Sequence, residues 1–541
     1  MADSHEYIAS LDDVKIGKNV LESLTRSAYD DCRCILREYV QNAADQIDLA
    51  RDTHLSESDD YSIHINLDKE NKRIEIYDNA TGVAAQEVLP ILRNVACSQK
   101  KRGKHKGFRG IGRLGGLGYC STLTFITSYK GEEVKSILKW DADKMTRMID
   151  DDNVEDSASE VVAKVTELRT EKEDKNKHYF KIVMENVTDM RLLDVQDIRN
   201  YISMVSPVEI SNDFLPFKTL IKRFMAENNL TLDTYDIYVN GDQMYKKYTK
   251  SILGKKGTII DEVKDLKFFI ENDSEGNPFY WGWYSICKLE GILDSTNIAK
   301  GIRLRCKNIQ LGNDNNCRRF LPGKQEERFT DYFFGEIHVL SERLIPDMDR
   351  NYLRVDDART EFEGKMIEQF AYLKSICHDA SEHRSDIKKI QDAEAKQENF
   401  EKKKRECSFN SEEERQREQE AFIRSKEEAD KARKRIERRK EKMKETDSPL
   451  QNVLPAPEED KRNEKKTENE SSWTYPTTVK SPSTTTYEKK SSGIRTDRDI
   501  YNKFSDDTRE VISSIYRVIG NILTDEWKTL VIAKIEEEIT K

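Results

Sequence analysis

The composition of the chain changes sharply after Glu363, and this change limits where packed domains can form. Residues 363–445 are rich in Glu, Lys, Arg, Gln and Ala and contain few apolar positions. Such a segment buries too little apolar surface to build a core of its own. With 541 residues the whole chain is long enough for two or three domains. We therefore expect the globular structure in the first two-thirds of the chain.

The first 216 residues combine helix and strand patterns. A helical pattern covers residues 20–52, and apolar and polar residues alternate, as in strands, in YSIHINLD (61–68) and KRIEIYDN (72–79). Further strands are predicted in STLTFITSY (121–129), VVAKVTEL (161–168) and HYFKIVMENV (178–187), the last two after an exposed acidic loop. These patterns predict one α+β domain over residues 1–216.

A second mixed region is predicted over residues 217–362. The stretch TYDIYVNGDQMYKKY (234–248) indicates a strand followed by a turn at Asn240-Gly241. Strands are also predicted in GIRLRCKNIQLGN (301–313) and at the start of FGEIHVLSERLIPDMDRNYL (334–353). The aromatic stretch PFYWGWYSI (278–286) is most simply core.

Three segments follow the second region. Residues 363–445 are predicted as a charged helical segment held by i,i+4 ion pairs, because the sustained apolar spacing of a strong coiled coil is missing. Residues 446–496 indicate a disordered linker. Residues 497–541 predict a short helical unit whose apolar stripe needs a partner, either within the chain or in a homodimer; the stripe comprises Val511, Ile515, Val518 and Ile522.

Charge and cysteine content exclude several classes of protein. The net charge of -10 argues against a globally basic nucleic-acid coat. The nine cysteines are scattered, and Cys32 and Cys34 lack the spacing of a zinc site. No stretch approaches the roughly 18 apolar residues of a membrane-spanning helix, and the N-terminus has no apolar signal core. We therefore expect a soluble, cytoplasmic protein with reduced thiols.

The stretch REYVQNAADQID (37–48) places an acid and an amide on one side of a helix that also carries apolar residues. Glu38 and Asn42 are four positions apart and therefore lie one turn apart. In an ordinary amphipathic helix both side chains would point at water. In a binding helix they would face a ligand instead.

Two other segments favour the interpretation of this helix as part of a ligand-binding site. RIEIYDNATGVAA ends a strand in Asp78 and continues into a turn with Gly82, where a carboxylate could accept a hydrogen bond from an exocyclic amine such as that of adenine. The segment 102–121 contains six glycines between positions 107 and 118, together with basic side chains, which suit an anion, although a flexible basic surface loop is the alternative. A Rossmann fingerprint does not fit its position after two strands, and a Walker loop would need Gly-Lys-Ser/Thr.

This order of motifs closely resembles the nucleotide-binding domain of the GHKL ATPases (gyrase, heat-shock protein 90, histidine kinase, MutL), particularly the heat-shock-protein-90 branch with its bacterial HtpG-like members. The resemblance implies a Bergerat-type α/β sandwich that binds ATP and Mg²⁺. Glu38 would be the general base for water, Asn42 the Mg²⁺ ligand, and Asp78 and Gly82 part of the adenine pocket. The glycines that would close over the phosphates are Gly107, Gly110 and Gly112.

The resemblance extends into the second region and stops after Phe362. VLSERLIPDMDRNYL is similar to the family's middle-domain loop, which would make Arg350 the arginine that reaches the γ-phosphate. A surface arginine paired with Asp347 or Asp349 is the alternative. The sequence departs from the family at Ala80, where a glycine is usual, and it shows no threonine at the start of KHYFKIVMENV.

Two functions follow from the resemblance. The preferred one is a slow ATPase of chaperone type that cycles between open and closed states, closes residues 89–106 as a lid and acts on client proteins as a homodimer. The alternative is an ATP-gated dimerising clamp or scaffold resembling MORC or MutL proteins. Basic runs such as KKRGKHK keep a nucleic-acid partner open, but the net charge does not favour one.

Overall fold

The computed structural model describes residues 16–25, 31–95 and 112–454, except positions 322, 324, 348, 407, 446, 447, 452 and 453. The predicted linker at 446–496 lies almost entirely outside the described residues, as do the C-terminal unit at 497–541 and its apolar stripe. Everything below concerns the compact unit that ends at Lys465. None of the helices described in it is long and apolar enough to span a membrane.

The first sheet has eight strands in the order β5-β4-β3-β6-β2-β1-β7-β8. All neighbours pair antiparallel except β1 and β7, which are parallel. The strands are β1 (Ser62–Asp68), β2 (Arg73–Asp78), β3 (Thr122–Ser128), β4 (Val134–Asp141), β5 (Thr166–Lys172), β6 (Tyr179–Glu185), β7 (Asp236–Val239) and β8 (Asp242–Gln243).

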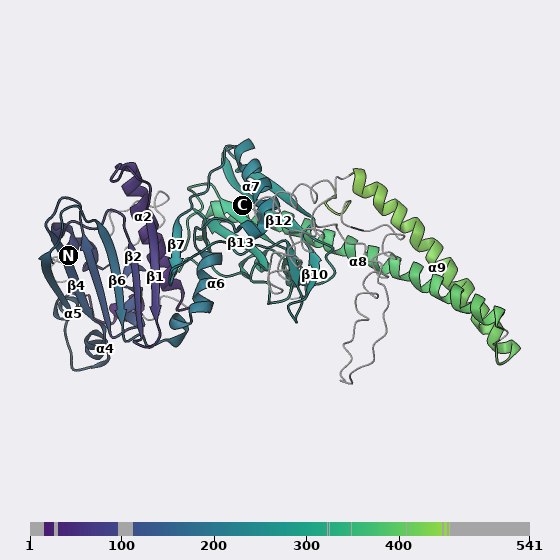
Figure 1. Cartoon of the computed structure of the whole chain (residues 1–541), viewed down its shortest axis with the longest axis horizontal. Coiled ribbons are helices and arrows are strands. Elements are labelled where there is room, and N and C mark those ends of the chain that lie inside the picture. The colour runs from purple at the N-terminus through teal and green to yellow at the C-terminus, as the bar shows by residue number, and fades with distance from the viewer. Residues whose placement is uncertain are drawn as a thin grey trace, which may run out of the picture. The chain divides into compact units, whose positions relative to one another are not determined.

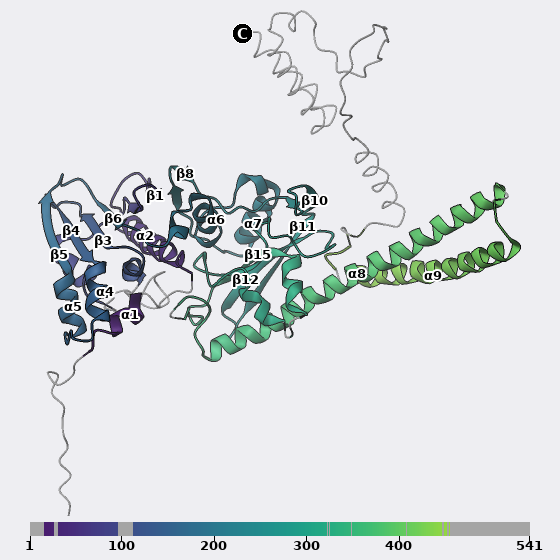
Figure 2. The ribbon, with the colours of Figure 1, turned by 90° about the horizontal axis from the view of Figure 1, so that it is seen from below.

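Helices cover one face of the first sheet. In β1, Ile63, Ile65 and Leu67 are buried against them, while the alternating side chains on the other face stay at least partly exposed. Figure 2 shows α1, α2, α4 and α5 together on one side of the strands. The helices of this region are α1 (Val20–Thr25), α2 (Cys34–Asp52), α3 (Val88–Leu92), α4 (Ala142–Asp150), α5 (Ala158–Val165), α6 (Val195–Val205) and α7 (Leu215–Glu227).

The second sheet has five strands in the order β11-β12-β15-β13-β14. Trp281 and Trp283 of β12 are fully buried, which confirms that this aromatic stretch is core. The strands are β11 (Asp265–Asn272), β12 (Pro278–Ile286), β13 (Gly301–Cys306), β14 (Ile309–Gln310) and β15 (Phe334–Val339). The short strands β9 (Ser251–Leu253) and β10 (Ile259–Glu262) form a separate ribbon.

Two long helices, α8 (Asp357–Arg405) and α9 (Glu412–Glu445), lie side by side in both views of the chain (Figures 1 and 2). Asp386 pairs with Arg435 and Arg439, while Lys403 pairs with Glu418, so the two helices run antiparallel. The predicted solvated helix therefore needs correction, because small and branched side chains form an apolar seam between the two helices. The seam comprises Ile387, Ile390, Ala393, Ala429, Ala432 and Ile436.

The strand predicted at 161–168 is wrong over its first half. Residues 158–165 form α5, because Ser157 and Glu160 make a reciprocal capping box that starts a helix there. β5 begins only at Thr166. The strand β4 and the helix α4, which begins at an Asp141 cap, were not predicted.

The first sheet also runs past the boundary predicted between residues 216 and 217. After α6 and α7 the chain returns to pair β7 with β1. The side chain of Asn240 continues this pairing, since it accepts from the Leu67 N–H at 2.7 Å and donates to the Leu67 carbonyl at 3.0 Å. The predicted turn is confirmed here, because Asn240 and Gly241 both have positive φ and connect β7 to β8.

A buried ion cluster sits between α6 and the second sheet. The Glu336 carboxylate lies 2.6 Å from Arg305 Nε and 3.1 Å from Lys246 Nζ. It also accepts a hydrogen bond from the Tyr248 hydroxyl at 2.8 Å and lies 2.9 Å from His338 Nε2. Arg305 Nη2 in turn donates to the carbonyl of Met204 near the end of α6, at 2.6 Å. The cluster thus connects the last helical turn of α6 to β13 and β15.

Candidate nucleotide site

Helix α2 carries Glu38 into the protein interior. Its apolar residues pack against the first sheet, and Glu38 itself is only 8% exposed. The Tyr39 hydroxyl accepts a hydrogen bond from the Gly116 N–H at 3.1 Å, which fixes the 3-10 helix Gly112–Gly118 over α2. Glu38 is therefore not the solvent-facing acid of an ordinary amphipathic helix.

Gly112 comes so close to Glu38 that no larger residue fits without movement. A Cβ placed on Gly112 would lie 2.6 Å from Glu38 Oε2 and 3.2 Å from Glu38 Cβ. The backbone of the glycine-rich segment is thus next to the acid. Gly107 and Gly110, predicted with Gly112 to close over phosphates, lie outside the described residues.

Three side chains surround the Glu38 carboxylate. Gln41 Nε2 donates to Glu38 Oε1 at 3.3 Å. Arg37 Nη2 lies 3.5 Å from the same oxygen, and so does Arg350 Nε. The two 3.5 Å separations are long for hydrogen bonds, so the attraction between the guanidinium groups and the Glu38 carboxylate is mainly electrostatic. The structure therefore brings together Glu38 and Arg350, which lie on α2 and on a loop after β15.

Arg350 sits in a tight turn. It has a φ of 53°, and its side chain is buried, with the residue 7% exposed, rather than lying on the surface. The Asp347 carboxylate accepts from the N–H groups of Asn351 at 2.9 Å and Tyr352 at 3.0 Å, which closes the turn. Arg37 Nη2 also donates to the Asp349 carbonyl at 3.3 Å, so α2 contacts the backbone of this turn as well.

Asp78 ends β2 inside the protein. It is 3% exposed, and its Oδ1 accepts from the Ala80 N–H at 3.1 Å. Ala80, at the position where the family usually has glycine, is not among the described residues with positive φ, so its methyl group adds no backbone strain. The departure at Ala80 is therefore compatible with the turn.

Gly82 has a φ of 66° and packs directly against another strand. A Cβ there would lie 2.0 Å from the carbonyl oxygen of Ser128 at the end of β3. The next N–H, from Val83, donates to the Thr127 hydroxyl at 2.8 Å, and that hydroxyl donates to the Tyr179 carbonyl at 3.1 Å. Only a glycine allows this close approach of the turn to β3.

The sequence has no threonine at the start of KHYFKIVMENV, but the structure places Thr81 and Thr127 near the turn that follows Asp78. Phe180 pairs with Asp78 on one side and with Thr127 on the other, so the threonine lies two strands from the acid. Thr81, 6% exposed, donates from its hydroxyl to Gln46 of α2 at 2.6 Å. The strand order, which a single sequence does not reveal, makes Thr127 a neighbour of the turn.

Asn42 lies one turn after Glu38 on α2 and is half-buried. Its side chain makes no hydrogen bond to the other described residues. No group of three or more His, Cys, Asp or Glu able to hold a metal ion occurs in the described part of the chain. An amide that shares a metal with phosphate oxygens does not require such a group.

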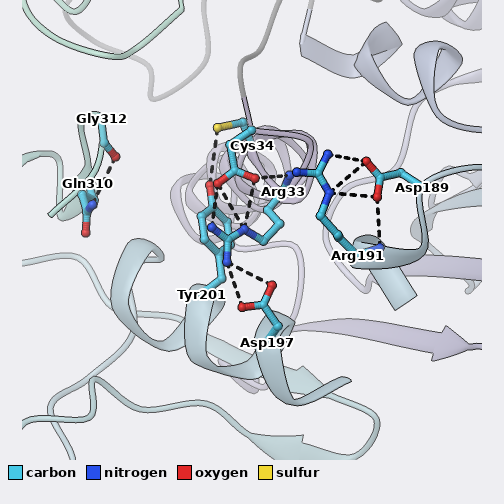
Figure 3. Close-up of polar contacts among 9 residues, drawn as sticks. Arg33, Cys34, Asp189, Arg191, Asp197, Tyr201, Gln310 and Gly312 are labelled. Carbon is cyan, nitrogen blue, oxygen red and sulfur yellow. Dashed lines mark hydrogen bonds and ion pairs between the residues drawn. The ribbon is translucent and has the colours of Figure 1, made fainter. Parts of the chain in front are cut away.

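The N-terminal end of α2 is anchored by charged side chains (Figure 3). Arg33 bonds Asp31 at 2.8 Å and Asp197 of α6 at 2.9 Å. Burial alone would raise the pKa of Asp31, but its bonds to Arg33 lower it below its usual value. The Tyr201 hydroxyl donates to Cys34 Sγ at 3.6 Å. The first helical turn of α2 is thereby fixed to α6.

A cavity of about 510 Å³ adjoins this end of α2. It reaches from Arg33 and Tyr201 to the segment after β14 and to the Arg350 turn, where Asp349 and Asn351 line it. Burial, together with Asp189, raises the pKa of the nearby Cys32 thiol to about 12.

Comparison with known proteins identifies the first region. Residues 34–175 match the family described as "Histidine kinase-, DNA gyrase B-, and HSP90-like ATPase". Proteins named "Chaperone protein HtpG" are similar over part of their length. The protein from Francisella tularensis subsp. novicida is 31% identical over 143 residues, 23% of each chain, and that from Bacillus licheniformis is 30% identical over 132 residues, 21% of each chain.

The relative from Anaplasma phagocytophilum is 32% identical over 124 residues, which are 20% of this chain and 19% of that protein. The alignments thus span less than a quarter of the curated relatives. The segment that carries Glu38, Asn42 and Asp78 lies within the residues that match the family. The resemblance inferred from the motifs is confirmed for this segment. Residues 34–175 form an ATPase domain of the GHKL superfamily, similar to the corresponding part of the HtpG chaperones.

Proposed function

We propose that this protein binds and slowly hydrolyses ATP and uses the cycle to move between open and closed states, as a chaperone resembling heat-shock protein 90. The observation that carries this proposal is the 3.5 Å contact between Glu38 Oε1 and Arg350 Nε. It joins an acid of the GHKL domain to a cation from a loop beyond β15. A reaction that needs both groups depends on the loop being in contact with α2.

Glu38 is proposed as the general base. Its burial and the neighbouring Gln41 amide hold the carboxylate in place, and a carboxylate within reach of water can orient it and accept its proton. Arg350 is proposed to stabilise the negative charge that develops on the transferred phosphoryl group. Before substrate is present, the two side chains neutralise one another.

Asn42 and Gly112 are proposed to contact the phosphate end of the nucleotide. The half-buried amide of Asn42 offers an oxygen of the kind that Mg²⁺ prefers, and the missing side chain of Gly112 lets its backbone approach Glu38 closely. When bound, Mg²⁺ would offset the charge of the phosphates. Gly107, Gly110 and Gly112 are proposed to close over them.

Asp78 is proposed to accept a hydrogen bond from the adenine amine. Its Oδ1 already accepts from the Ala80 N–H, which orients the carboxylate, and a carboxylate oxygen is an acceptor suited to an amine. Gly82 shapes the same turn by its close approach to β3. The adenine would lie beside Asp78 and Gly82, and the phosphates would lie near Glu38.

The proposed cycle of opening and closing would involve other protein chains. A homodimer and client proteins are proposed from the similarity to HtpG chaperones. The lid is proposed to lie in residues 89–106, of which 96–106 are outside the described residues. The MORC- or MutL-like clamp differs in its output, since closure around nucleic acid or a protein would be the function and hydrolysis would reset it.

Two variants test the proposal. Glu38→Ala should lower kcat by about 10²–10⁴-fold and leave the Kd for ATP nearly unchanged, since the base acts on water. Arg350→Ala should lower kcat by a similar or larger factor. Turnover within a few-fold of the unmodified protein in both variants would refute the assignment.

Separate assays distinguish the two outputs. Suppression of client aggregation without affinity for DNA supports the chaperone. DNA binding that weakens steeply with salt supports the clamp.

A further inference from the structure

The Arg350 turn is held from outside by the segment that follows β14. The Gly312 N–H donates to the Arg350 carbonyl at 2.8 Å. The side-chain nitrogen of Asn316 donates to the Asn351 carbonyl at 2.8 Å and to the Leu311 carbonyl at 3.1 Å. Two consecutive carbonyls of the turn, those of Arg350 and Asn351, are thus fixed by donors outside it.

Asn316 is well placed for this task. It is 7% exposed and starts the 3-10 helix Asn316–Phe320, whose Cys317 and Phe320 are buried in the core of the second sheet. A single amide nitrogen supplies both donated bonds, which neither a carboxylate nor an aliphatic side chain can do. The turn is therefore attached to a rigid part of the second sheet.

The same short helix supports the far side of the turn. Arg319 donates from Nε to the Asn316 carbonyl at 3.0 Å, and its guanidinium lies 3.6 Å from the centre of the Tyr352 ring. Tyr352 follows the turn directly. The backbone of the Arg350 turn is consequently held by the hydrogen bonds from Gly312 and Asn316 and by the stacking of Arg319 on Tyr352.

The backbone of Arg350 needs such support. A non-glycine residue with φ of 53° is in a sparsely populated conformation that persists only where the surroundings hold it. Asp347 closes the turn from within, but its bonds do not fix the turn relative to the sheet. The bonds from Gly312 and Asn316 supply that connection.

We propose that Asn316 is a positioning residue that sets the Arg350 guanidinium against Glu38. This inference rests on the proposed function, in which Arg350 acts on the phosphate. Loss of the amide lets the turn relax to other backbone conformations. The guanidinium then spends less time at the place where charge develops, while the adenine end of the site is unaffected.

Asn316→Ala should therefore lower kcat by about 10- to 100-fold, as small misplacements of catalytic groups do, and leave the Kd for ATP within twofold. Asn316→Asp, which keeps the shape but replaces the donor with an acceptor, should show the same loss. Asn315→Ala is the matched control, because Asn315 is the exposed neighbour of the same type. If Asn316→Ala does not fold, Asn316→Ser, which keeps one donor, should give an intermediate kcat.

A double-mutant cycle separates positioning from general damage. In an Arg350→Ala background, Asn316→Ala should change kcat by less than twofold, because there is no guanidinium left to position. An unchanged kcat in Asn316→Ala alone, or an equal loss in both backgrounds, would overturn the inference.

Hydrogen exchange makes the test independent of hydrolysis. The Gly312 amide should exchange at least tenfold faster in Asn316→Ala than in Asn315→Ala, whether or not ATP is hydrolysed. Unchanged exchange refutes the positioning role. If the Gly312 amide exchanges faster in Asn316→Ala but the unmodified protein has no ATPase activity, the positioning role stands and the proposed function is refuted instead.

Discussion

Replacing Glu336 with glutamine is the sharpest test of how α6 is joined to the second sheet. The substitution keeps the shape of the side chain and its contact with the Tyr248 hydroxyl, but removes the negative charge that faces Lys246 and Arg305. All of these groups are buried. Burial alone would raise the pKa of Glu336, but Arg305 and Lys246 outweigh it and hold the pKa well below its usual value. The carboxylate is therefore charged at neutral pH.

The size of the effect follows from the two cations. Removing one member of a buried ion pair costs about 3–5 kcal/mol, because the remaining charge is left unpaired. Lys246 limits this cost: burial, and then Arg305, lower its pKa to about 7, so it can lose its proton near neutral pH. An arginine side chain keeps its positive charge in a protein, so Arg305 would lose its ionic partner. We therefore expect a loss near the lower end, about 3 kcal/mol in the free energy of unfolding at pH 7.

The deficit should shrink as the pH rises from 7 to 9. The folded pKa of Lys246 lies below its unfolded value of 10.5, so between these values the unfolded state binds more protons and deprotonation favours folding. At pH 9 Lys246 is neutral in both folded proteins, and only Arg305 still loses a partner. The pH dependence thus separates the contribution of the lysine from that of the arginine.

Urea unfolding followed by tryptophan fluorescence measures the effect. Trp283 and Trp281 of β12 pair with Glu336 and His338 of β15, so their emission reports on the cluster directly. With an m value of roughly 2 kcal/mol/M, a 3 kcal/mol loss moves the midpoint by about 1.5 M. Glu342→Gln, at an exposed position nearby, is the control. A shift no larger than that of the control would show that the buried charges contribute nothing.

Three further results are expected. Asp78→Asn should weaken ATP binding by about 10-fold or more, because a charged acceptor becomes an amide; unchanged affinity in calorimetry would remove Asp78 from the site. Gly82→Ala should cost roughly 2–5 kcal/mol in urea unfolding, from the left-handed φ and the overlap with Ser128, and an unchanged midpoint would contradict this. Burial lowers the pKa of His338 to about 4, below its unfolded 6.5, so stability should fall as pH drops from 6.5 towards 4, and His338→Gln should flatten that slope.

Local patterns predicted the elements whose cause is local. The alternation in residues 61–68 and 72–79 matches β1 and β2, and Asn240-Gly241 matches the turn between β7 and β8. The helix α5 was missed because its valines look like a strand until the Ser157 capping box is considered. Packing between α8 and α9 was missed because a seam of isoleucine and alanine is too sparse to show a heptad.

In the candidate site, too, features with a local cause were predicted and features that depend on tertiary structure were not. The spacing of Glu38 and Asn42 on one helix and the strand end at Asp78 are local features, and Arg350 came from resemblance to a known loop. The supports of these residues are not local: Arg37 contacts Asp349 from 312 positions away, and Asn316 contacts Asn351 from 35. Such bonds depend on tertiary structure and leave no periodic trace in a single sequence.

The parallel pairing of β1 with β7 also has a consequence for synthesis of the protein. Leu67 and Asn240 are bonded across 173 positions, so the first sheet cannot be completed until residues up to 243 have left the ribosome. At about 5–20 residues per second, β1 waits on the order of ten seconds or more with one edge open. An open edge of this kind recruits other strands. The nascent chain therefore still carries this open β1 edge throughout the translation of α6 and α7.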